Sequence, residues 1–361
     1  MRILQLIDSL EAGGAERMAV NYANALAGEI NFSGLVATRK EGTLLHHIHP
    51  NVSYLFLHKK AIVDFRALFR LRSFVLENNV THIHAHSTSF FLAFLVKITY
   101  PSVILIWHLH YGGSEFLSKR RLLVLRMVLP FFNGIIAVNQ NLKNWVEKAV
   151  NFKKTVYLPN FPSTETEVLG NTVLKGTQGK RIVSLANLRA EKNHFLLLEV
   201  AKKMQLSHSE WTFHLIGKDF EDDYSKQIKE MILDFNLEKN VFIYGSKQDI
   251  PTILAQANIA VLTSKIEGLP VALLEYGLHK KAVVVTRVGE LPLIIEQGKN
   301  GFLVQSNDLD MFYSKLVYLI NNKSLQGSFA ENLHQTVEER FSETSIIKQY
   351  IHWIRTTIVN E

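Results

Sequence analysis

The stretch from Ala257 to Glu275 reads Ala-Asn-Ile-Ala-Val-Leu-Thr-Ser-Lys-Ile-Glu-Gly-Leu-Pro-Val-Ala-Leu-Leu-Glu and indicates the class of fold. Its first seven residues form a short apolar run, which is typical of a buried strand. Pro270 suits the first turn of a helix, because the N–H that proline lacks is not needed there. The stretch therefore predicts a strand, a loop and a helix, the unit that α/β proteins repeat.

Two carboxylates mark this unit. Glu267 falls in the predicted loop, and Glu275 falls about one and a half turns inside the helix. Between them, Gly268 and Leu269 bring backbone N–H groups to a helix N-terminus, where unpaired donors and the helix dipole favour a phosphate. A phosphate flanked by two carboxylates that can bind hydroxyl groups suggests a nucleotide-sugar ligand.

The same alternation of strands and helices runs through the chain. Apolar strand-like runs fall at residues 3–7, 34–38, 52–57, 81–84, 103–107, 134–138, 181–185, 212–216, 241–244, 259–262 and 282–286. Helical stretches separate most of them, a pattern that predicts two tandem doubly wound parallel-sheet (Rossmann-like) domains. In such sheets ligands bind beyond the carboxyl ends of the strands, so we expect the site in an interdomain cleft.

The alternation of strands and helices is interrupted between Pro159 and Lys180. We interpret this polar stretch as the interdomain linker. The predicted domains are residues 1–165 and residues 175–341. At 361 residues and 47% hydrophobic composition, each domain can bury a substantial core.

Composition also excludes several classes of protein. The chain has no cysteine, which rules out disulfides and thiolate metal sites. No secretory signal is expected, because the first apolar stretch ends at Asp8. The most apolar window, residues 90–107, contains Lys97 and Pro101, so it predicts a buried helix, a turn and a buried strand, with no transmembrane helix.

Positive charge is concentrated in the first half of the chain. Residues 1–165 hold 18 Lys and Arg against 10 Asp and Glu, whereas residues 166–361 hold 22 against 23. Such an asymmetry can attract an anionic membrane surface, an acidic substrate or nucleic acid. Segments 65–76 and 119–132 mix basic with bulky apolar residues, which favours an anionic membrane surface and no nucleic acid. The alternative, two ordinary amphipathic helices packed on a sheet, stays open.

A basic loop opens the second domain. The run from Val183 to Asn193 predicts a strand followed by a tight polar loop, which places Arg189 and Lys192 at the carboxyl end of the strand. Two cations there could hold a diphosphate. The alternative is that Lys192 is simply a solvated loop residue.

An ordered set of motifs carries a family resemblance. The motifs are Ala186-Asn-Leu-Arg-Ala-Glu-Lys-Asn193, Gly217-Lys-Asp219, Val241–Gly245, Ser264–Glu275 and Asn300-Gly-Phe-Leu-Val304. In this order and spacing they resemble the family 4 retaining glycosyltransferases (glycosyl transferases group 1) of GT-B fold, over nearly the whole chain. Gly13-Gly-Ala-Glu-Arg17 is similar to the family's glycine-rich opening loop. The resemblance also implies that a C-terminal helix, about residues 342–361, crosses back onto the acceptor-side first domain.

The resemblance implies roles for particular residues. Lys192 and a neighbouring basic residue would hold the donor diphosphate, Glu267 would contact the transferred sugar, and Glu275 would bind the ribose. The other donor-binding residues would be Gly268, Leu269, Asn187, Gly217, Gly13 and Gly14. Ala186-Asn187 replaces the family's usual Gly-Arg, so we predict that Arg189 supplies the missing charge.

Histidines form a second pattern. His82, His84 and His86 alternate, which would put all three on one face of a strand, a spacing that can bind metal. No carboxylate accompanies them, so we predict no metal site. His108 resembles the family's first-domain histidine that faces the donor sugar, and it completes the predicted catalytic set of Glu267, Lys192 and Arg189.

The two glutamates are not a glycosidase pair. A retaining glycosidase needs two carboxyl groups about 5 Å apart, whereas eight helical residues already span about 12 Å. The resemblance instead implies front-face transfer, in which the leaving diphosphate helps to deprotonate the acceptor hydroxyl while cations and a helix N-terminus stabilise its charge. No metal or other cofactor is expected.

These observations predict a retaining glycosyltransferase of cell-surface polysaccharide biosynthesis, such as lipopolysaccharide or capsule. It would transfer a hexose or N-acetylhexosamine from a UDP- or GDP-sugar to a glycan or polyprenyl-linked acceptor, as a cytoplasmic protein peripheral on the inner face of the membrane. The alternatives are a nucleotide-sugar epimerase or hydrolase of the same fold and a non-catalytic nucleotide-sugar-binding protein. An NAD-dependent enzyme is disfavoured because no Gly-x-Gly-x-x-Gly follows the first strand.

Overall fold

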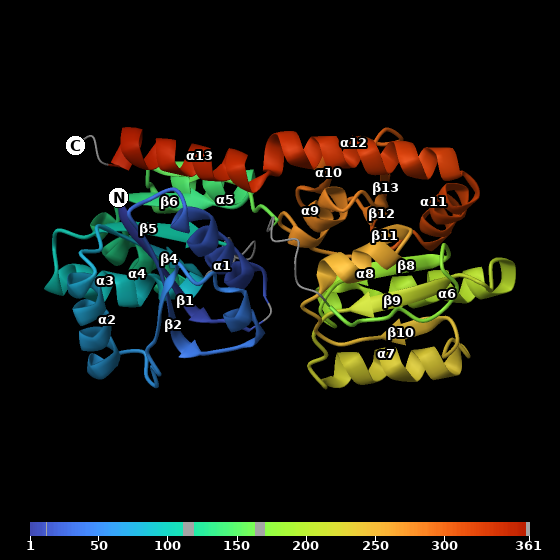
Figure 1. Ribbon diagram of the computed structural model, residues 1–361, viewed down its shortest axis with the longest axis horizontal. Helices are drawn as coiled ribbons and strands as arrows, with labels where there is room; N and C mark the ends of the chain where they lie inside the picture. The colour runs from blue at the N-terminus through green and yellow to red at the C-terminus, as the bar shows by residue number, and fades with distance from the viewer. Residues whose placement is uncertain (12, 111–118, 163–169, 359–361) are drawn as a thin grey trace. The chain divides into compact units, whose positions relative to one another are not determined.

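The computed structural model describes residues 1–11, 13–110, 119–162 and 170–358, with the side chains of 119–122 left out. The chain forms two compact units (Figure 1). The first comprises Met1–Ser163 and Glu343–Glu361, and the second comprises Thr164–Ser342. Each unit is built on one parallel sheet with helices on both faces, so the predicted α/β class of two doubly wound domains is confirmed.

A seven-stranded parallel sheet forms the centre of the first unit, in the order β3-β2-β1-β4-β5-β6-β7. Its strands are β1 (Arg2–Ser9), β2 (Phe32–Lys40), β3 (Ser53–Phe56), β4 (His82–His86), β5 (Ile104–Leu109), β6 (Gly134–Ala137) and β7 (Thr155–Tyr157). The chain order reverses between β1 and β4. The apolar pattern predicted the first six strands but not β7, which has only three residues at the edge of the sheet.

Helices cover both faces of this sheet. They are α1 (Gly14–Ala27), α2 (Phe65–Glu77), α3 (Phe90–Thr99), α4 (Lys119–Val128), α5 (Gln140–Trp145) and α13 (Glu343–Trp353). Short 3₁₀ or π turns are η1 (Thr43–His47), η2 (Ser87–Ser89), η4 (Leu129–Phe131), η5 (Val146–Val150) and η7 (Ile354–Ile358). The stretch at residues 90–107 is a helix, a turn and a strand, as predicted.

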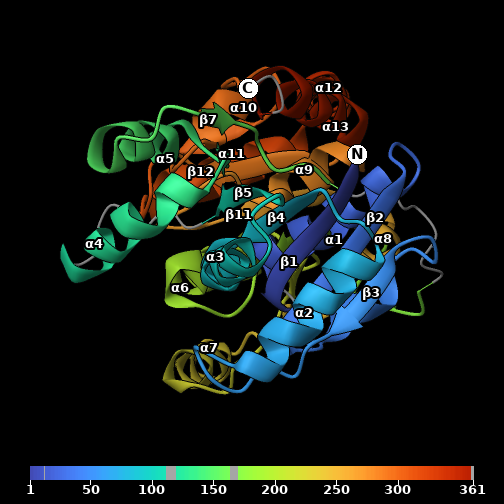
Figure 2. The ribbon, with the colours of Figure 1, turned by 90° about the vertical axis from the view of Figure 1, so that its left-hand side faces the viewer.

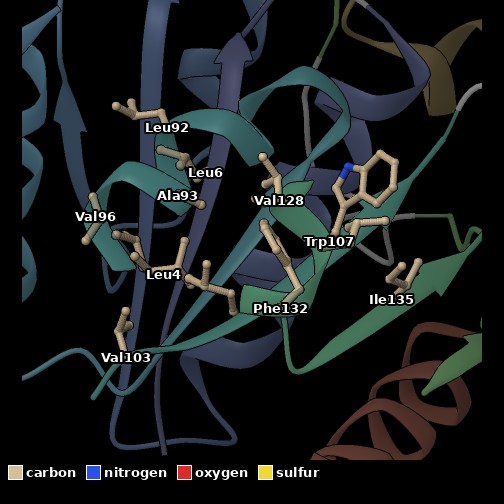
Figure 3. Packing of buried hydrophobic residues seen from close by; sticks show 14 of the residues in the cluster. Leu4, Leu6, Leu92, Ala93, Val96, Val103, Trp107, Val128, Phe132 and Ile135 are labelled. Carbon is tan, nitrogen blue, oxygen red and sulfur yellow. The ribbon is translucent and has the colours of Figure 1, made fainter. Parts of the chain in front are cut away.

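Alternation along the strands sorts the buried side chains of the first unit into two layers. Leu4 and Leu6 of β1 pack in one cluster with Ala93 and Val96 of α3, and this cluster also takes in buried residues of α2, α4 and α5 (Figures 2 and 3). Ile7 faces the other way and packs with residues of α1. The period of two in a strand thus fixes which helices cover which face.

The last helix of the chain packs on the first unit (Figure 1). Tyr350 of α13 is fully buried, and its ring packs edge-on against Tyr22 of α1 with ring centroids 5.0 Å apart. A Cβ at Gly134 would lie 2.6 Å from side-chain atoms of Trp353 and Ile358, so the glycine gives this segment room against β6. Of the predicted C-terminal segment, residues 359–361 lie outside the described part.

A six-stranded parallel sheet forms the second unit, in the order β10-β9-β8-β11-β12-β13. Its strands are β8 (Arg181–Leu185), β9 (Thr212–Ile216), β10 (Val241–Ile243), β11 (Ile259–Leu262), β12 (Ala282–Thr286) and β13 (Phe302–Val304). The chain order reverses between β8 and β11, the position at which open α/β sheets bind ligands.

Two layers of helices cover the second sheet. One face carries α6 (His194–Ser207), α7 (Asp223–Asp234) and α11 (Leu309–Asn321). The other carries α8 (Ile250–Gln256), α9 (Val271–Leu278), α10 (Leu291–Ile294) and α12 (Lys323–Phe341). Pro270 is the N-cap of α9 rather than its first helical residue.

Part of the predicted linker is anchored on the second unit. Leu174 is buried in its core, and both Thr172 N–H and Thr172 Oγ1 donate to the carboxylate of Asp249. Residues 163–169 of the predicted linker lie outside the described part. Among the helices that the structure describes, none is both long and apolar enough to cross a membrane.

Candidate active site

Two loops meet at the carboxyl ends of β8 and β11, which are neighbours in the second sheet. The first, residues 186–193, contains the 3₁₀ turn η6 (Ala190–Lys192) and leads into α6. The second, residues 263–270, leads into α9. Because the chain order reverses between β8 and β11, both loops leave the same edge of the sheet toward opposite faces, which opens a ligand position between them.

An ion pair joins the two loops. Lys192 Nζ donates a hydrogen bond to Glu267 Oε1 over 2.7 Å, with the side chains 24% and 7% exposed. Ser264 Oγ donates to the same carboxylate oxygen over 2.7 Å. The structure thus brings together the two residues that the sequence predicted for the diphosphate and for the sugar, and it adds Ser264, which the sequence analysis did not single out.

Further hydrogen bonds fix the loops to each other. Thr263 Oγ1 donates to the Lys192 carbonyl over 3.1 Å, and the Lys265 N–H donates to the Glu191 carbonyl over 2.8 Å. Asn193, which follows η6, has a φ of 53°, the left-handed conformation that asparagine tolerates. Lys192 and Glu267 are therefore held by backbone as well as by their own charges.

A third loop, after β12, supports the Glu267 segment. Thr286 Oγ1 donates to the Ser264 carbonyl over 2.7 Å, and Glu290 N–H donates to the Gly268 carbonyl over 3.0 Å. Gly289 has a φ of 55°, and a Cβ there would lie 2.1 Å from the Glu267 carbonyl oxygen. Only glycine fits this position, a requirement that the sequence analysis did not identify.

Two of the predicted donor-binding residues lie just before α9 begins. Gly268 and Leu269 directly precede the N-cap Pro270, and Leu269 is buried. Glu275 lies one turn further on and is half-buried. Lys280 pairs with Glu331, and Lys281 Nζ donates to the Ala257 carbonyl.

Asn187 and Gly217 lie in adjoining loops that follow β8 and β9. The Lys218 N–H donates to Asn187 Oδ1 over 2.8 Å. A Cβ at Gly217 would lie 2.1 Å from the Ala186 carbonyl oxygen, so glycine permits the close approach of the two loops. In this structure both residues shape the loop that carries Lys192, and their contact with a donor stays a prediction.

Arg189 is more exposed than Lys192, the other cation that is predicted to hold the donor diphosphate. Its guanidinium lies over the Phe220 ring, 4.5 Å from the centroid, and 3.9 Å from Glu191. The side chain is 52% exposed. Stacking on an aromatic ring orients a guanidinium while leaving its N–H groups available to an anion.

Tyr276 has a role that the sequence analysis did not assign. Its side chain is fully buried, and its hydroxyl accepts from the Leu185 N–H over 2.7 Å and donates to the Val261 carbonyl over 3.3 Å. Burial raises the pKa of Tyr276 above its ordinary value, so the hydroxyl stays protonated. It therefore ties α9 to the ends of β8 and β11, the strands that carry both active-site loops.

His84, His86, His108 and His110 form a histidine cluster in the first unit. His84 Nε2 lies 3.0 Å from His108 Nδ1, and His86 Nδ1 lies 2.9 Å from His110 Nε2. Tyr350 Oη contacts His84 Nδ1 at 3.1 Å. His108, a predicted catalytic residue, has no exposed surface, whereas His110 follows the end of β5 and is half-buried. His82 contacts Thr81 instead.

Burial keeps the histidine cluster neutral. It lowers the pKa of His84, His86 and His108 well below the usual range, with a smaller contribution from neighbouring histidines, and it lowers the pKa of His110 to about 3. One ligand atom each of His84, His86 and His108 lie within 4.8 Å of one another, close enough to hold a metal ion. Most of the ring nitrogens of these three histidines already take part in hydrogen bonds, so they are not available to a metal ion in this arrangement.

The remaining predicted residues, Gly13 and Gly14, lie where β1 leads into α1. Gly13 is the extended N-cap of the helix, and its carbonyl accepts from the Arg17 N–H over 2.9 Å. A Cβ at Gly14 would meet nothing within 4 Å. The predicted set is thus divided: Gly13, Gly14 and His108 belong to the first unit, and the other predicted residues belong to the second.

Family models match both halves of the chain. The model described as "Glycosyltransferase Family 4" matches residues 12–166, and that described as "Glycosyl transferases group 1" matches residues 170–336. Together with the two doubly wound units, they define a glycosyltransferase of GT-B type. The chain belongs to glycosyltransferase family 4.

Two relatives of stated activity are similar to the chain. The first is the poly(ribitol-phosphate) α-N-acetylglucosaminyltransferase of Staphylococcus aureus strain COL, 29% identical over 61% of this chain and 43% of its own length. The chain thus spans less than half of that relative. The second is the UDP-Gal:α-D-GlcNAc-diphosphoundecaprenol α-1,3-galactosyltransferase of Escherichia coli, 22% identical over 86% of each chain.

Among solved structures, that of Anabaena HepE in complex with UDP and glucose superposes with a TM-score of 0.81. It is 20% identical, over 99% of this chain and all of the other. This likeness establishes the GT-B fold.

Proposed function

We propose that the protein is a retaining, metal-independent glycosyltransferase that uses a UDP- or GDP-sugar as donor. The Lys192–Glu267 ion pair at the strand-order reversal carries this proposal. A donor diphosphate would take over Lys192 as its counterion, and the transferred sugar would take over Glu267. Arg189 would add a second cation to the diphosphate, and Glu275 would bind the ribose.

The same residues would stabilise the leaving group. Negative charge develops on the departing diphosphate in the transition state, and fixed cations and helix N-terminal N–H groups in a half-buried site stabilise it. Lys192, Arg189 and the start of α9 supply these groups without a metal ion. The leaving diphosphate would then accept the proton of the attacking acceptor hydroxyl on the same face of the sugar, which retains the anomeric configuration.

The acceptor proposed is a glycan or polyprenyl-linked glycan in cell-surface polysaccharide biosynthesis. The S. aureus relative is named for a ribitol-phosphate polymer and the E. coli relative for a diphosphoundecaprenol-linked sugar. Both names describe acceptors that belong to surface glycans or to their lipid-linked precursors. The donor would be a hexose or N-acetylhexosamine derivative, the two kinds of sugar in these names.

An exposed apolar-basic face of the first unit supports a place at the inner surface of the membrane. Helix α2 buries Ala67, Leu68 and Leu71 against the sheet, yet leaves Phe65 and Phe69 67% and 60% exposed. The neighbouring residues Ile62 and Val63 and, on α4 and η4, Leu123, Val124, Met127 and Phe131 are exposed as well. Bulky apolar side chains beside arginines suit an anionic lipid interface.

Two measurements test the proposal. Thermal shift of the full chain against UDP, GDP, ADP and dTDP and their sugars should single out one nucleotide, because ligand binding raises stability with occupancy. Donor consumption is then followed with and without acceptor glycans. Transfer that requires an acceptor and keeps the anomeric configuration supports the proposal, and transfer that persists in EDTA supports its metal independence.

The same measurements distinguish the alternatives. An epimerase or hydrolase would consume donor without any acceptor. A non-catalytic binding protein would bind the nucleotide, consume no donor and tolerate Glu267→Gln. Absence of a thermal shift with all four nucleotides would count against the donor site itself.

A further inference from the structure

The Glu267 carboxylate is a nearly buried negative charge in the proposed donor site. Its side chain is 7% exposed, and its Oε1 accepts from Lys192 Nζ and from Ser264 Oγ, each over 2.7 Å. Ser264 is itself buried, and Thr286 Oγ1 donates to its carbonyl over 2.7 Å. Because Ser264 is held by the surrounding loops, the negative charge of Glu267 has a fixed position in the site.

A phosphate group bound to Lys192 must lie close to this charge. Lys192 Nζ is 2.7 Å from Glu267 Oε1, and a hydrogen bond from the same ammonium to a phosphate oxygen is about 2.8 Å long. Two oxygens that contact one nitrogen in this way are at most about 5.5 Å apart. If Lys192 instead turned fully toward the phosphate, Glu267 would lose its counterion while nearly buried, which is unfavourable. In either arrangement the carboxylate opposes negative charge on the diphosphate.

The charge of the ligand changes during the proposed reaction. The bond between the anomeric carbon of the sugar and the phosphate oxygen breaks, and its electron pair leaves with the oxygen. The proton of the acceptor hydroxyl passes to the diphosphate and then to solvent, because a terminal phosphate loses its second proton near pH 6. Above about pH 7 the product therefore carries about one more negative charge than the donor, on the phosphate group that held the sugar.

We propose that Glu267 makes the donor site discriminate against the free nucleoside diphosphate, the product of the reaction, and thereby favours its release. The inference rests on the proposed function, because it requires that Lys192 binds the diphosphate. In the donor complex the sugar hydroxyl groups can donate to the carboxylate, to which Lys192 and Ser264 are the only hydrogen-bond donors among the described residues. In the product complex those hydroxyl groups are gone, and the additional charge lies near Glu267, where partial burial strengthens the repulsion.

Isothermal titration of the full chain tests this discrimination. The ligands are UDP, UDP-glucose and UDP-N-acetylglucosamine, with GDP and GDP-mannose in parallel, without acceptor and at about pH 7.5, where a terminal phosphate is fully ionised. Glu267→Gln removes the charge and keeps an oxygen that can accept from Lys192 and Ser264. It should bind the free nucleotide about tenfold or more tightly than the wild type does, and this gain should exceed any gain for the nucleotide-sugar.

Three further variants separate charge from the other effects of this substitution. Glu267→Ala also removes the charge and should show the same gain for the free nucleotide. Glu267→Asp keeps the carboxylate and should bind the free nucleotide no more tightly than the wild type does. Glu275→Gln makes the same chemical change at the carboxylate predicted to bind the ribose, which donor and product share, so it should not tighten the binding of the free nucleotide either.

The outcomes distinguish this inference from the proposed function. Affinity for the free nucleotide that is unchanged or weaker in Glu267→Gln and Glu267→Ala would overturn the inference. An equal gain for nucleotide and nucleotide-sugar would also overturn it, as would the same gain in Glu267→Asp or Glu275→Gln. If none of the ligands binds the wild type, the proposed function fails and the inference fails with it. Measurable binding without the expected gain removes the inference alone and leaves the donor site in place.

Discussion

Lys192 Nζ and Glu267 Oε1 lie 2.7 Å apart, although their loops are separated by 75 residues in the sequence. Each side chain is the counterion of the other, and the carboxylate is nearly buried. The pair therefore holds both groups in place before a ligand arrives, and a bound donor would replace the internal contact with contacts of its own.

Replacing one member of this pair should affect activity and stability differently. Lys192→Met is expected to lower turnover about 10²–10³-fold, because it removes a fixed charge from the leaving group. It also leaves the Glu267 carboxylate without its counterion, which should lower the free energy of unfolding by about 1–3 kcal/mol. The double variant Lys192→Met/Glu267→Gln should regain stability but not activity. Urea unfolding followed by the fluorescence of Trp211, the one tryptophan of the second unit, measures the stability term. Equal stability of the single and double variants would contradict this account.

Arg189→Gln should have a smaller effect than Lys192→Met. The guanidinium is half exposed and stacks on Phe220, so solvent screens its contribution to donor binding. We expect the donor KM to rise by less than about tenfold, and kcat to fall by less than it does in Lys192→Met. Phe220→Leu, which removes the stacking partner, should reproduce part of this rise. Steady-state kinetics with varied donor checks both variants, and a loss of kcat as large as that of Lys192→Met would contradict the smaller role of Arg189.

Gly289→Ala should disturb the Glu267 loop. The new Cβ would lie 2.1 Å from the Glu267 carbonyl oxygen, and the φ of 55° is unfavourable for alanine. Gly298→Ala is the matched control, because Gly298 has a φ of 76° and nothing lies within 4 Å of its Cβ position. The control should lose about 1 kcal/mol from backbone strain alone. Gly289→Ala should lose more stability than the control, and it should also bind the donor more weakly. Trp211 fluorescence in urea and thermal shift with nucleotide compare the two, and equal losses would refute the steric argument.

Membrane binding should depend on the exposed phenylalanines of α2. Phe65→Ser/Phe69→Ser removes apolar surface that is not used in the core, so we expect about tenfold or greater weakening of binding to anionic vesicles. Leu206→Ser, at an 88% exposed leucine of the second unit, is the control and should bind like the wild type. Vesicle co-sedimentation in about 0.05 M and about 0.5 M salt measures both variants and the charge contribution. Binding that is insensitive to salt and to the double substitution would remove the membrane assignment.

The histidine cluster should make the first unit sensitive to acid. Burial lowers the pKa of His84, His86 and His108 in the folded state, so below pH 6.5 the unfolded chain takes up protons that the folded chain does not. Stability is then fully present above about pH 6.5 and falls as the pH decreases, by about 1.4 kcal/mol per pH unit for each histidine. In Trp211→Phe the remaining tryptophans, Trp107, Trp145 and Trp353, all report on the first unit. Urea midpoints at pH 7 and pH 5 should differ clearly, and equal midpoints would contradict neutral burial.

The pattern of apolar residues predicted most of the strands and helices. Runs such as residues 259–262 and 282–286 are short, continuous and apolar because their strands are buried on both faces of a parallel sheet. The edge strands β7 and β13, of three residues each, were not predicted from the pattern. The structure places the C-terminal helix in the first unit, which periodicity alone could not predict because the contact of Tyr350 with Tyr22 spans nearly the whole chain.

The class of the protein, its alternation of strands and helices, and the loops that carry Glu267 and Lys192 could be predicted from the sequence, because burial and turn chemistry act over a few neighbouring residues. The contacts between those loops are visible only in the folded chain. The fold pairs Lys192 with Glu267, places Gly289 against the Glu267 carbonyl and buries His108. These relations join residues from different strands, and their distances depend on how a twisted parallel sheet aligns the carboxyl ends of its strands.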